Sequence, residues 1–434
     1  MLVPETRPPP QPASPQPNGA QARATPLDPR PGRTSEAELA VAVVAMTHGV
    51  LAHHAQTAQR IERVLAIDPG AAIGHAVRGF ALCLQMRTDL ADAIATSLLR
   101  AEVALHERGG TDAEQSLVAG LRAYAAGRPF EALAALDARL LRAPSDLLTL
   151  KLAHALHFLV GDTASLRRAV DAAVSAQPED LIGRGFALGC QAFARIESGD
   201  VDEGERIGRA AVERQPDDAW GVHAVTHALA TKNLTREGIA WLRACAPGLT
   251  GVNNFGGHVA WHEALCHLAL GEDDAALALY DARIAVHLAG DYRDVVNAAT
   301  LLHRLRQRGL DVRDRAARLA SHALARRGDH GSAFGDVHYV IAISDHDTTA
   351  AREFAESMRA AADERTTHEA LMGRRVACDL ADAIVVLASG ARSSHLFESQ
   401  RARWPELGGS RIQRETFDRL FEEALARDAT LGRD

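Results

Sequence analysis

The stretch that decides the fold reads GRPFEALAALDARLLRAP (residues 127–144), and its pattern returns in GDTASLRRAVDAAVSAQP (161–178) and GDVDEGERIGRAAVERQP (199–216). Each segment places a proline 17 residues after its first glycine. The glycine permits a tight turn between two helices, and the proline ends the second helix. A small residue five positions after the glycine, Ala132 or Gly204, lets the helices approach closely. The three segments therefore predict a repeated helix-turn-helix unit.

The spacing of these units is that of a helical-repeat protein. The glycines recur after 34 and then 38 residues, which matches the tetratricopeptide class, where neighbouring units must stack to bury their apolar faces. Two further units follow, with Asn233 and Gly271 at the glycine position. Aromatic residues make up only 4% of the chain, and no alternating strand pattern is present. We therefore expect an all-α fold, a tetratricopeptide-like α-solenoid of stacked helix-turn-helix repeats.

The chain divides into three parts by composition. Residues 1–34 hold ten of the seventeen prolines, which predicts a disordered, proline-rich N-terminal tail. Ser35 and Glu38 form a capping box that marks the first folded helix. We expect tetratricopeptide-like repeats over residues 35–290 and C-terminal helical repeats over residues 291–434. Whether this last part closes the superhelix is left open by the sequence.

Composition also narrows the class of partner. A formal net charge of −8 argues against nucleic acid, which needs clustered positive charge. There is no run of 18 or more apolar residues, so we expect no membrane partner. The five cysteines are widely spaced, with no CxxC pair, and the N-terminus lacks the pattern of a secretory signal. The expected location is cytoplasmic.

Two histidine pairs are the strongest candidates for a functional site. His223/His227 and His258/His262 are each spaced i,i+4, so each pair projects from one helical face. Counting back from the turn residues Asn233 and Gly271 places the pairs on or beside the groove side of neighbouring first helices. Trp220 and Trp261 fall on the same side.

This pattern allows more than one interpretation. Neutral imidazole is the commonest metal ligand, so His223, His227, His258 and His262 are candidate ligands of a divalent metal, the one cofactor that the sequence suggests. Glu263 and Asp281 are candidate carboxylates to orient the imidazoles. The alternative is that the histidines pack between helices and bond to backbone or to each other. Two i,i+4 pairs among twenty histidines are weak evidence of a metal by themselves.

Two other motifs carry polar groups. His154 and His157 lie in another first helix, where we expect core histidines. Ser410 and Gln413 form a capping box at the start of a helix whose first turn carries Arg411 and Arg414. That turn is either a capped helix with surface arginines or a site where free N–H groups and arginine hold an anion or a carboxylate.

Several segments resemble the tetratricopeptide repeat protein 38 family. They are WGVHAVTH (220–227), HVAWHEAL (258–265), the DVV and LHRL segments at 294–305, FGDVH (334–338) and LGGS…QRETF (407–417). The resemblance implies an all-helical, tetratricopeptide-like solenoid in which the four histidines, Asp336, His338 and the Gly-Gly-Ser…Gln-Arg run occupy signature positions. It implies no particular reaction. Where the family carries a glutamate, three residues after His227, this chain has Ala230.

The leading expectation is a concave groove that binds a small molecule or a peptide. Its expected binding residues are Trp220, His223, His227, His258, Trp261, His262, Asp336, His338 and Arg414. A second hypothesis is an enzyme in which the histidines hold a metal or act as general acid and base. A third is a protein-protein interaction scaffold, which is favoured if the chain's own C-terminal helices fill the groove.

Overall fold

The computed structural model describes residues 31–288 and 291–431, and over these residues it confirms the all-α class. The backbone there consists of helices, turns and one isolated bridge between His54 and Val252. Residues 1–30 of the expected proline-rich tail lie outside the described residues. The first helix begins at Pro31, four residues before the Ser35 that the capping pattern indicated.

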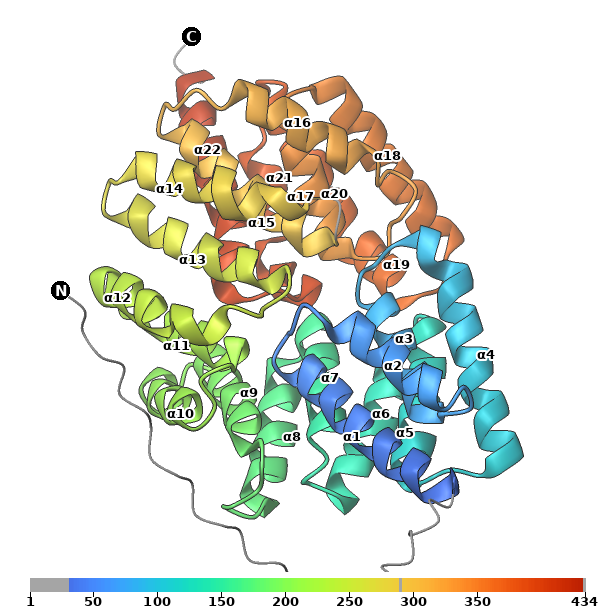
Figure 1. Cartoon of the computed structure of the whole chain (residues 1–434). Coiled ribbons are helices and arrows are strands. Elements are labelled where there is room, and N and C mark those ends of the chain that lie inside the picture. The colour runs from blue at the N-terminus through green and yellow to red at the C-terminus, as the bar shows by residue number, and fades with distance from the viewer. Residues whose placement is uncertain (1–30, 289–290, 432–434) are drawn as a thin grey trace, which may run out of the picture.

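Most of the helices come in consecutive pairs that pack against each other, from α1 and α2 to α17 and α18 (Figure 1). The first twelve are α1 (Pro31–Leu51), α2 (Thr57–Ile67), α3 (Ala72–Cys83), α4 (Ala91–Arg108), α5 (Asp112–Ala125), α6 (Pro129–Arg142), α7 (Leu147–Leu159), α8 (Thr163–Ala176), α9 (Arg184–Glu197), α10 (Val201–Arg214), α11 (Ala219–Thr231) and α12 (Thr235–Cys245). The remaining ten are α13 (Phe255–Ala269), α14 (Asp273–Leu279), α15 (Tyr292–Gln307), α16 (Arg313–Leu324), α17 (Ala333–Ser344), α18 (Thr348–Glu364), α19 (His368–Met372), α20 (Cys378–Ala388), α21 (Ser394–Glu398) and α22 (Arg411–Leu431).

The turn residues behave as their positions in the repeat predict. Gly127 and Gly161 have φ of 72°, and Gly199 has φ of 90°, a left-handed conformation that favours glycine. Asn233, which takes the glycine position of a later unit, has φ of 58°, and asparagine tolerates this region better than most side chains do. The repeat pattern thus marks the inter-helix turns correctly.

The small and proline positions of the repeat are also confirmed. A Cβ atom on Gly204 would lie 2.5 Å from Cγ1 of Ile196, so this position needs glycine for the close approach of α9 and α10. The second helices α6, α8 and α10 end two residues before a proline, at Arg142, Ala176 and Arg214.

The first helices of successive pairs form the inner layer. Helices α9, α11, α13, α15, α17 and α20 contact one another in that order. The buried apolar side chains form two main cores, one running from Ala42 to Val259 and the other from Ala260 to Ala424. Helix α13 belongs to both cores, so it joins the two halves of the molecule.

The two halves also meet away from α13. The Thr88 hydroxyl donates to Oδ1 of Asp329 at 2.6 Å, and the backbone N–H of His368 donates to the Gly127 carbonyl at 3.0 Å. His368 is the first residue of α19, so this helix is bonded to the turn between α5 and α6. The helical array therefore curves until N-terminal and C-terminal elements touch.

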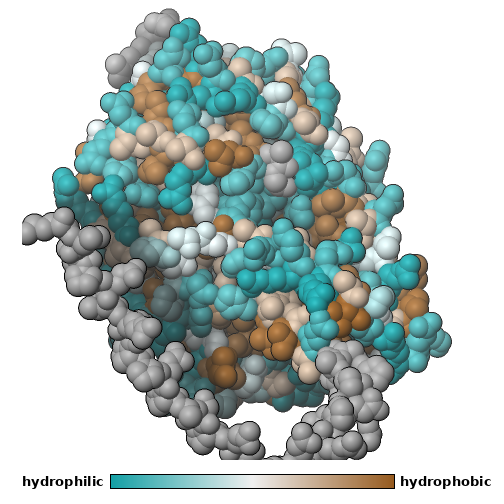
Figure 2. All heavy atoms as spheres, viewed as in Figure 1, coloured by the Kyte–Doolittle hydropathy of each residue, from teal (hydrophilic) through white to brown (hydrophobic). Residues whose placement is uncertain are grey.

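The surface offers no membrane-spanning element in the part of the chain that the structure describes. None of its helices combines the length and the apolar character needed to cross a bilayer. On the face drawn in Figure 2, hydrophobic residues form small groups separated by hydrophilic ones.

Candidate functional site

The four histidines of the two pairs come together in the structure. His223 and His227 lie on α11, and His258 and His262 lie on α13. All four side chains are buried, and one nitrogen from each lies within 4.8 Å of those of the other three. We call His223, His227, His258 and His262 the histidine cluster. The i,i+4 spacing and the contact between α11 and α13 together place it.

Hydrogen bonds fix the orientation of two rings. Nδ1 of His227 lies 2.9 Å from Oε1 of Glu197, and Nδ1 of His258 lies 2.9 Å from Oδ1 of Asn297. Nε2 of both rings faces Nε2 of His223, at 2.9 Å and 3.0 Å. Nε2 of His262 is buried and has no hydrogen-bond partner.

Burial keeps three of these imidazoles neutral. It is the largest cause that lowers the pKa of His258 to about 3, and it lowers the pKa values of His223 and His262 well below the usual value. The neighbouring His227 lowers all three further. Neutral rings keep a lone pair on one nitrogen, which is the form that binds metal ions.

A cavity of about 580 Å³ adjoins the cluster. We call it the central cavity. His223, His258 and Trp220 line it on one side. Its other walls include α2, α3 and the turn after it, α7, the loop after α1, the start of α15 and the loop before α22, so segments far apart in the sequence meet here. The cavity is therefore a product of the curvature that brings the two halves together.

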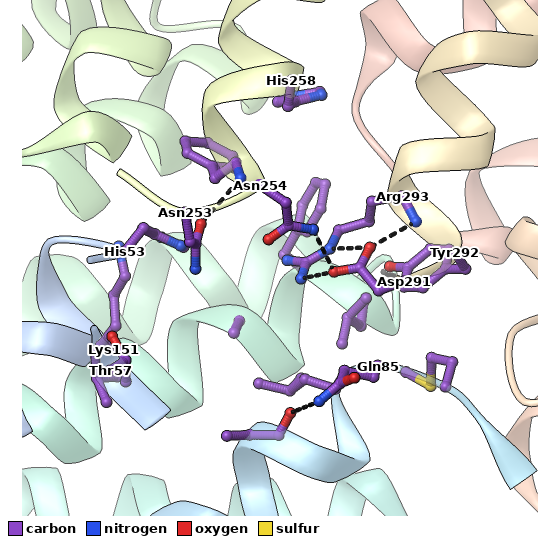
Figure 3. A pocket seen from close by; sticks show the side chains of 18 of the residues that line it. His53, Thr57, Gln85, Lys151, Asn253, Asn254, His258, Asp291, Tyr292 and Arg293 are labelled. Atoms are coloured by element: carbon purple, nitrogen blue, oxygen red, sulfur yellow. Dashed lines mark hydrogen bonds and ion pairs between the residues drawn. The ribbon is translucent and has the colours of Figure 1, made fainter. Parts of the chain in front are cut away.

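One wall of the central cavity is a network of charged and amide groups (Figure 3). Nη2 of Arg293 lies 2.6 Å from Oδ2 of Asp291, which also accepts a hydrogen bond from Nδ2 of Asn254 at 2.9 Å. The same amide donates to Oδ2 of Asp294 at 3.0 Å. Burial, together with the charge of Asp291, raises the pKa of Asp294 to about 7. This wall can hold polar groups of a ligand in a fixed orientation.

Lys151 is a cavity residue that the sequence analysis missed. Its side chain is buried on α7, and Nζ has no hydrogen-bond partner. Nζ lies 5.0 Å from the ring centre of Trp220, within the range of a cation–π contact. The signal was present, because Lys151 is the only charged residue of types Lys, Arg, Asp or Glu in LLTLKLAHALHFL.

His53 also lines the central cavity, and no pattern in the sequence indicated it. It follows α1 with φ of 51°, and its ring stacks on Phe255 with centroids 4.6 Å apart. The backbone after α1 is bonded to the loop before α13, because the Asn253 N–H donates to the His53 carbonyl at 2.8 Å. This contact brings the N-terminal helical pair to the cavity, as Figure 3 shows.

The other expected binding residues lie elsewhere. Trp261 is fully buried and donates from Nε1 to Oγ1 of Thr300 at 2.9 Å, so it is a packing residue. Asp336 pairs with His330 at 3.1 Å. His338 uses Nδ1 to donate to the Phe334 carbonyl at 2.8 Å. The structure does not bring these three side chains into the lining of the central cavity.

The two carboxylates expected to orient the imidazoles, Glu263 and Asp281, are engaged in other ion pairs. Glu263 pairs with Arg243 at 3.3 Å, and Asp281 pairs with Arg315 at 2.6 Å. Glu197, at the end of the neighbouring helix α9, takes the place expected for them. Its distance of 30 residues from His227 gave no local spacing by which to recognise it.

The two remaining histidines of the sequence analysis differ from each other. Both are buried. His157 pairs with Asp137 at 3.0 Å. His154 packs against Phe193 and Trp220 and lines the central cavity. The expectation of core histidines fits both, but His154 also faces the cavity.

The Gly-Gly-Ser turn completes the cavity wall and begins α22. The expected capping box is present: the Gln413 N–H donates to Oγ of Ser410 at 3.2 Å, and the Ser410 N–H donates to Oε1 of Gln413 at 2.9 Å. Arg414 donates to the carbonyls of Gly408 and Gly409, so it holds the turn and does not line the cavity. The carboxylate at this helix start is Glu197, whose Oε2 accepts from the Arg411 N–H at 3.0 Å.

Comparison with protein-family models finds no match for this chain. The functional argument therefore rests on the geometry of the cluster and the cavity.

Proposed function

We propose that the chain is a tetratricopeptide-like helical-repeat protein, related to the tetratricopeptide repeat protein 38 family, that binds a small molecule in its central cavity beside a divalent metal ion held by the histidine cluster. The repeat assignment is supported by the glycine turns and by the succession of first helices along the inner layer. The five cysteines are free in the structure, which supports a reducing, cytoplasmic location.

The observation that carries the metal proposal is the approach of three Nε2 atoms. His227 and His258 direct their Nδ1 atoms to oxygen acceptors, so each of these rings, in the neutral form that binds a metal, presents a lone pair at Nε2. Both lone pairs face Nε2 of His223, which carries at most one proton and can donate to only one of them. Together with Nε2 of His262, which has no partner, they form a set of acceptors that a cation would satisfy.

The distances suit a transition metal. A tetrahedral ion with bonds of about 2.0–2.1 Å to nitrogen separates its ligands by about 3.3 Å, and the cluster spans separations from 2.9 Å to at most 4.8 Å. Imidazole nitrogens suit zinc, copper, iron and nickel. The oxygens of Glu197 and Asn297 on the far ring nitrogens are the outer partners that such ligands usually have.

Elemental analysis tests the metal. Protein made without a histidine tag should take up one equivalent of Zn²⁺ or Co²⁺ per chain and melt at a higher temperature with the metal bound. The double variant His227→Ala/His262→Ala should lose both effects. His267→Ala is the matched control, because His267 is a buried histidine of the same helix that pairs with Glu272 instead. Substoichiometric metal with no metal-dependent melting shift would leave helix packing as the role of these histidines.

The small-molecule proposal is supported by the size and lining of the central cavity. Its volume of about 580 Å³ falls within the range of about 300–1,000 Å³ typical of ligand pockets. The C-terminal segment crosses the inner side of the array without filling it, and this disfavours the scaffold hypothesis. Ala155→Phe, which places a ring in the cavity from α7, should reduce the amount of small molecule that co-purifies in native mass spectrometry. Equal ligand content in this variant and the wild type would contradict the proposal.

An enzyme is the second candidate, favoured by two carboxyl groups of the cavity. Burial raises the pKa values of Asp294 and Glu369 to about 7, near the value that suits general acid–base catalysis at neutral pH. Both line the central cavity, as do His223 and His258 of the cluster. If the co-purifying molecule is turned over, Asp294→Asn and Glu369→Gln should lower kcat while the protein still binds it. Unchanged kcat in both variants would exclude them as acid or base.

A further inference from the structure

A second cavity, of about 690 Å³, lies on another side of the histidine cluster. Four arginines line it: Arg304 from α15, Arg308 directly after that helix, and Arg411 and Arg419 from α22. One carboxylate, that of Glu415, faces them from within the lining. We call this cavity the arginine pocket. Its lining thus carries an excess of positive charge in a protein whose net charge is negative.

Arg304 is the residue that points to a ligand. It is only 7% exposed, and its Nε and Nη2 atoms are buried with no hydrogen-bond partner. Arg304 forms one long ion pair, in which Nη2 lies 3.8 Å from Oε2 of Glu415, and the Glu415 side chain is half exposed. A buried guanidinium is costly unless anions or acceptors pair with it. Burial, followed by the neighbouring Arg419, lowers the pKa of Arg304 to about 10, so it stays charged at neutral pH.

The other cations of the pocket are partly engaged. Nε of Arg308 lies 2.6 Å from Oδ1 of Asp273, and Arg411 donates to Oγ1 of Thr231. Arg419 is exposed on α22 and close enough to Arg304 to affect its pKa. Arg304 and Arg419 are therefore the two groups best placed to grip an oxyanion, since a guanidinium presents a planar fork of donors to it.

The pocket also reaches the histidine cluster. His262 lines the arginine pocket, whereas His223 and His258 line the central cavity. The cluster thus stands between two cavities of different character, one mostly apolar with a polar wall and the other basic. A ligand anchored at Arg304 would extend toward His262.

We propose that the arginine pocket binds the carboxylate or phosphate group of a small organic molecule through Arg304 and Arg419. This inference goes beyond the metal and the central cavity, because the arginines are distinct from the four histidines and their binding does not need a metal. The small side chain of Ala230, which also lines the pocket, leaves room for the ligand.

Calorimetric titration tests the proposal with inorganic phosphate and with succinate, each added to the full chain after removal of metal by a chelator. Succinamide, which is neutral, serves as the comparison ligand. Binding of either anion should weaken at least tenfold in Arg304→Met and measurably in Arg419→Gln. Because Arg419 is on the surface, the second variant stays informative even where the first does not fold. Arg313→Gln, an exposed arginine of α16 paired with Asp311, should bind as the wild type does. Preference for phosphate or for succinate identifies which oxyanion the ligand carries.

Four results would overturn the proposal. The first is that neither anion binds the wild type. The second is that succinamide binds as well as succinate while phosphate does not bind. The third is that both arginine variants bind the anions as the wild type does. Anion binding that requires Zn²⁺ and survives both arginine changes would also overturn it, because the anion would then sit on the metal. That last outcome would support the metal proposal, so the two fail separately.

Discussion

Oε1 of Glu197 accepts a hydrogen bond from Nδ1 of His227 at 2.9 Å. Oε2 of the same carboxylate accepts a hydrogen bond from the Arg411 N–H, the first residue of α22, at 3.0 Å. Burial alone would raise the pKa of Glu197, but its bonds with His227 and Arg411 and the nearby charges outweigh burial and lower it. One ionised carboxylate therefore connects α9, the histidine cluster and the start of the last helix.

Glu197→Gln should weaken metal binding at the cluster about 10–100-fold, the usual effect of losing a partner behind a histidine ligand. An amide is a poorer acceptor than a carboxylate for the His227 N–H and removes the negative charge. Competition between the protein and a chelator for Zn²⁺ measures the change. Glu263→Gln, next to His262 but paired with Arg243, is the control and should leave the affinity unchanged. Equal losses in the two variants would contradict a specific role of Glu197.

The attachment of α22 to α15 should depend on pH. Burial opposes a charge on His303, but its interactions with Asp345 and Glu423 outweigh this and raise its pKa above 6.5. The interaction with His303 is the largest cause that lowers the pKa of Glu423, to about 2. The His303 contribution to stability is fully present below pH 6.5 and is lost as the pH rises through its raised pKa. The Glu423 contribution is present above pH 4.5 and is lost as the pH falls towards 2.

Between pH 4.5 and 6.5 both contributions are therefore at work. The difference in free energy of unfolding between the wild type and His303→Gln should be largest at about pH 5.5 and should decrease as the pH rises through the raised pKa of His303. Urea unfolding at a series of pH values measures it. Ser321→Ala, at an exposed position of the neighbouring helix α16, should show no such pH dependence. A difference that stays constant with pH would show that the charge of His303 does not hold the helix.

Gly408 should be intolerant of any side chain. It has φ of 78°, and a Cβ atom there would lie 2.4 Å from the Leu159 carbonyl oxygen. Gly309 has a similar φ of 88° but open space around its Cβ position. Gly309→Ala should therefore cost about 1 kcal/mol from backbone strain alone, and Gly408→Ala should cost clearly more. If chemical denaturation gives the same loss for both, then the turn moves freely and does not rest against α7.

Thr88 and Asp329 hold one of the contacts between the two halves. Both the hydroxyl and the N–H of Thr88 donate to Oδ1 of Asp329, at 2.6 Å and 3.1 Å. Thr88→Val removes the hydroxyl bond and should lower stability by about 1.5–3 kcal/mol, as for other hydrogen bonds to charged groups. It should also speed amide exchange in the loop at Asp329. Ser389→Ala, whose hydroxyl donates to the Val386 carbonyl near the end of α20, should do neither.

The helices and inter-helix turns could be predicted from the sequence because they depend on local requirements, such as glycine in a left-handed turn and proline after a helix end. The left-handed turns at Gly127, Gly161 and Gly199 and the helix ends before the prolines are local properties, and the structure has them where the pattern placed them. The start of α1 at Pro31 was missed, because the proline content of that region dominated the prediction. Proline is tolerated in the first turn of a helix.

The site could be predicted only where it is local. The i,i+4 spacing placed His223 with His227 and His258 with His262, and the contact between α11 and α13 brought the two pairs together. The partner Glu197 and the cavity residues Lys151 and His53 come from other helices and loops, so their places depend on the curvature of the whole array. The spacing of residues along the sequence does not indicate how strongly the helical array curves.

The contact between the two halves also bears on how the chain unfolds. In an open array of repeats, each unit contacts only its neighbours, so the end units can unfold one at a time. Here the turn before α6 is bonded to α19, and Asp329 is bonded to the turn before α4. Because these bonds tie N-terminal helices to C-terminal ones, neither end can unfold without breaking contacts with the other half. We therefore expect the chain to melt as a single cooperative unit.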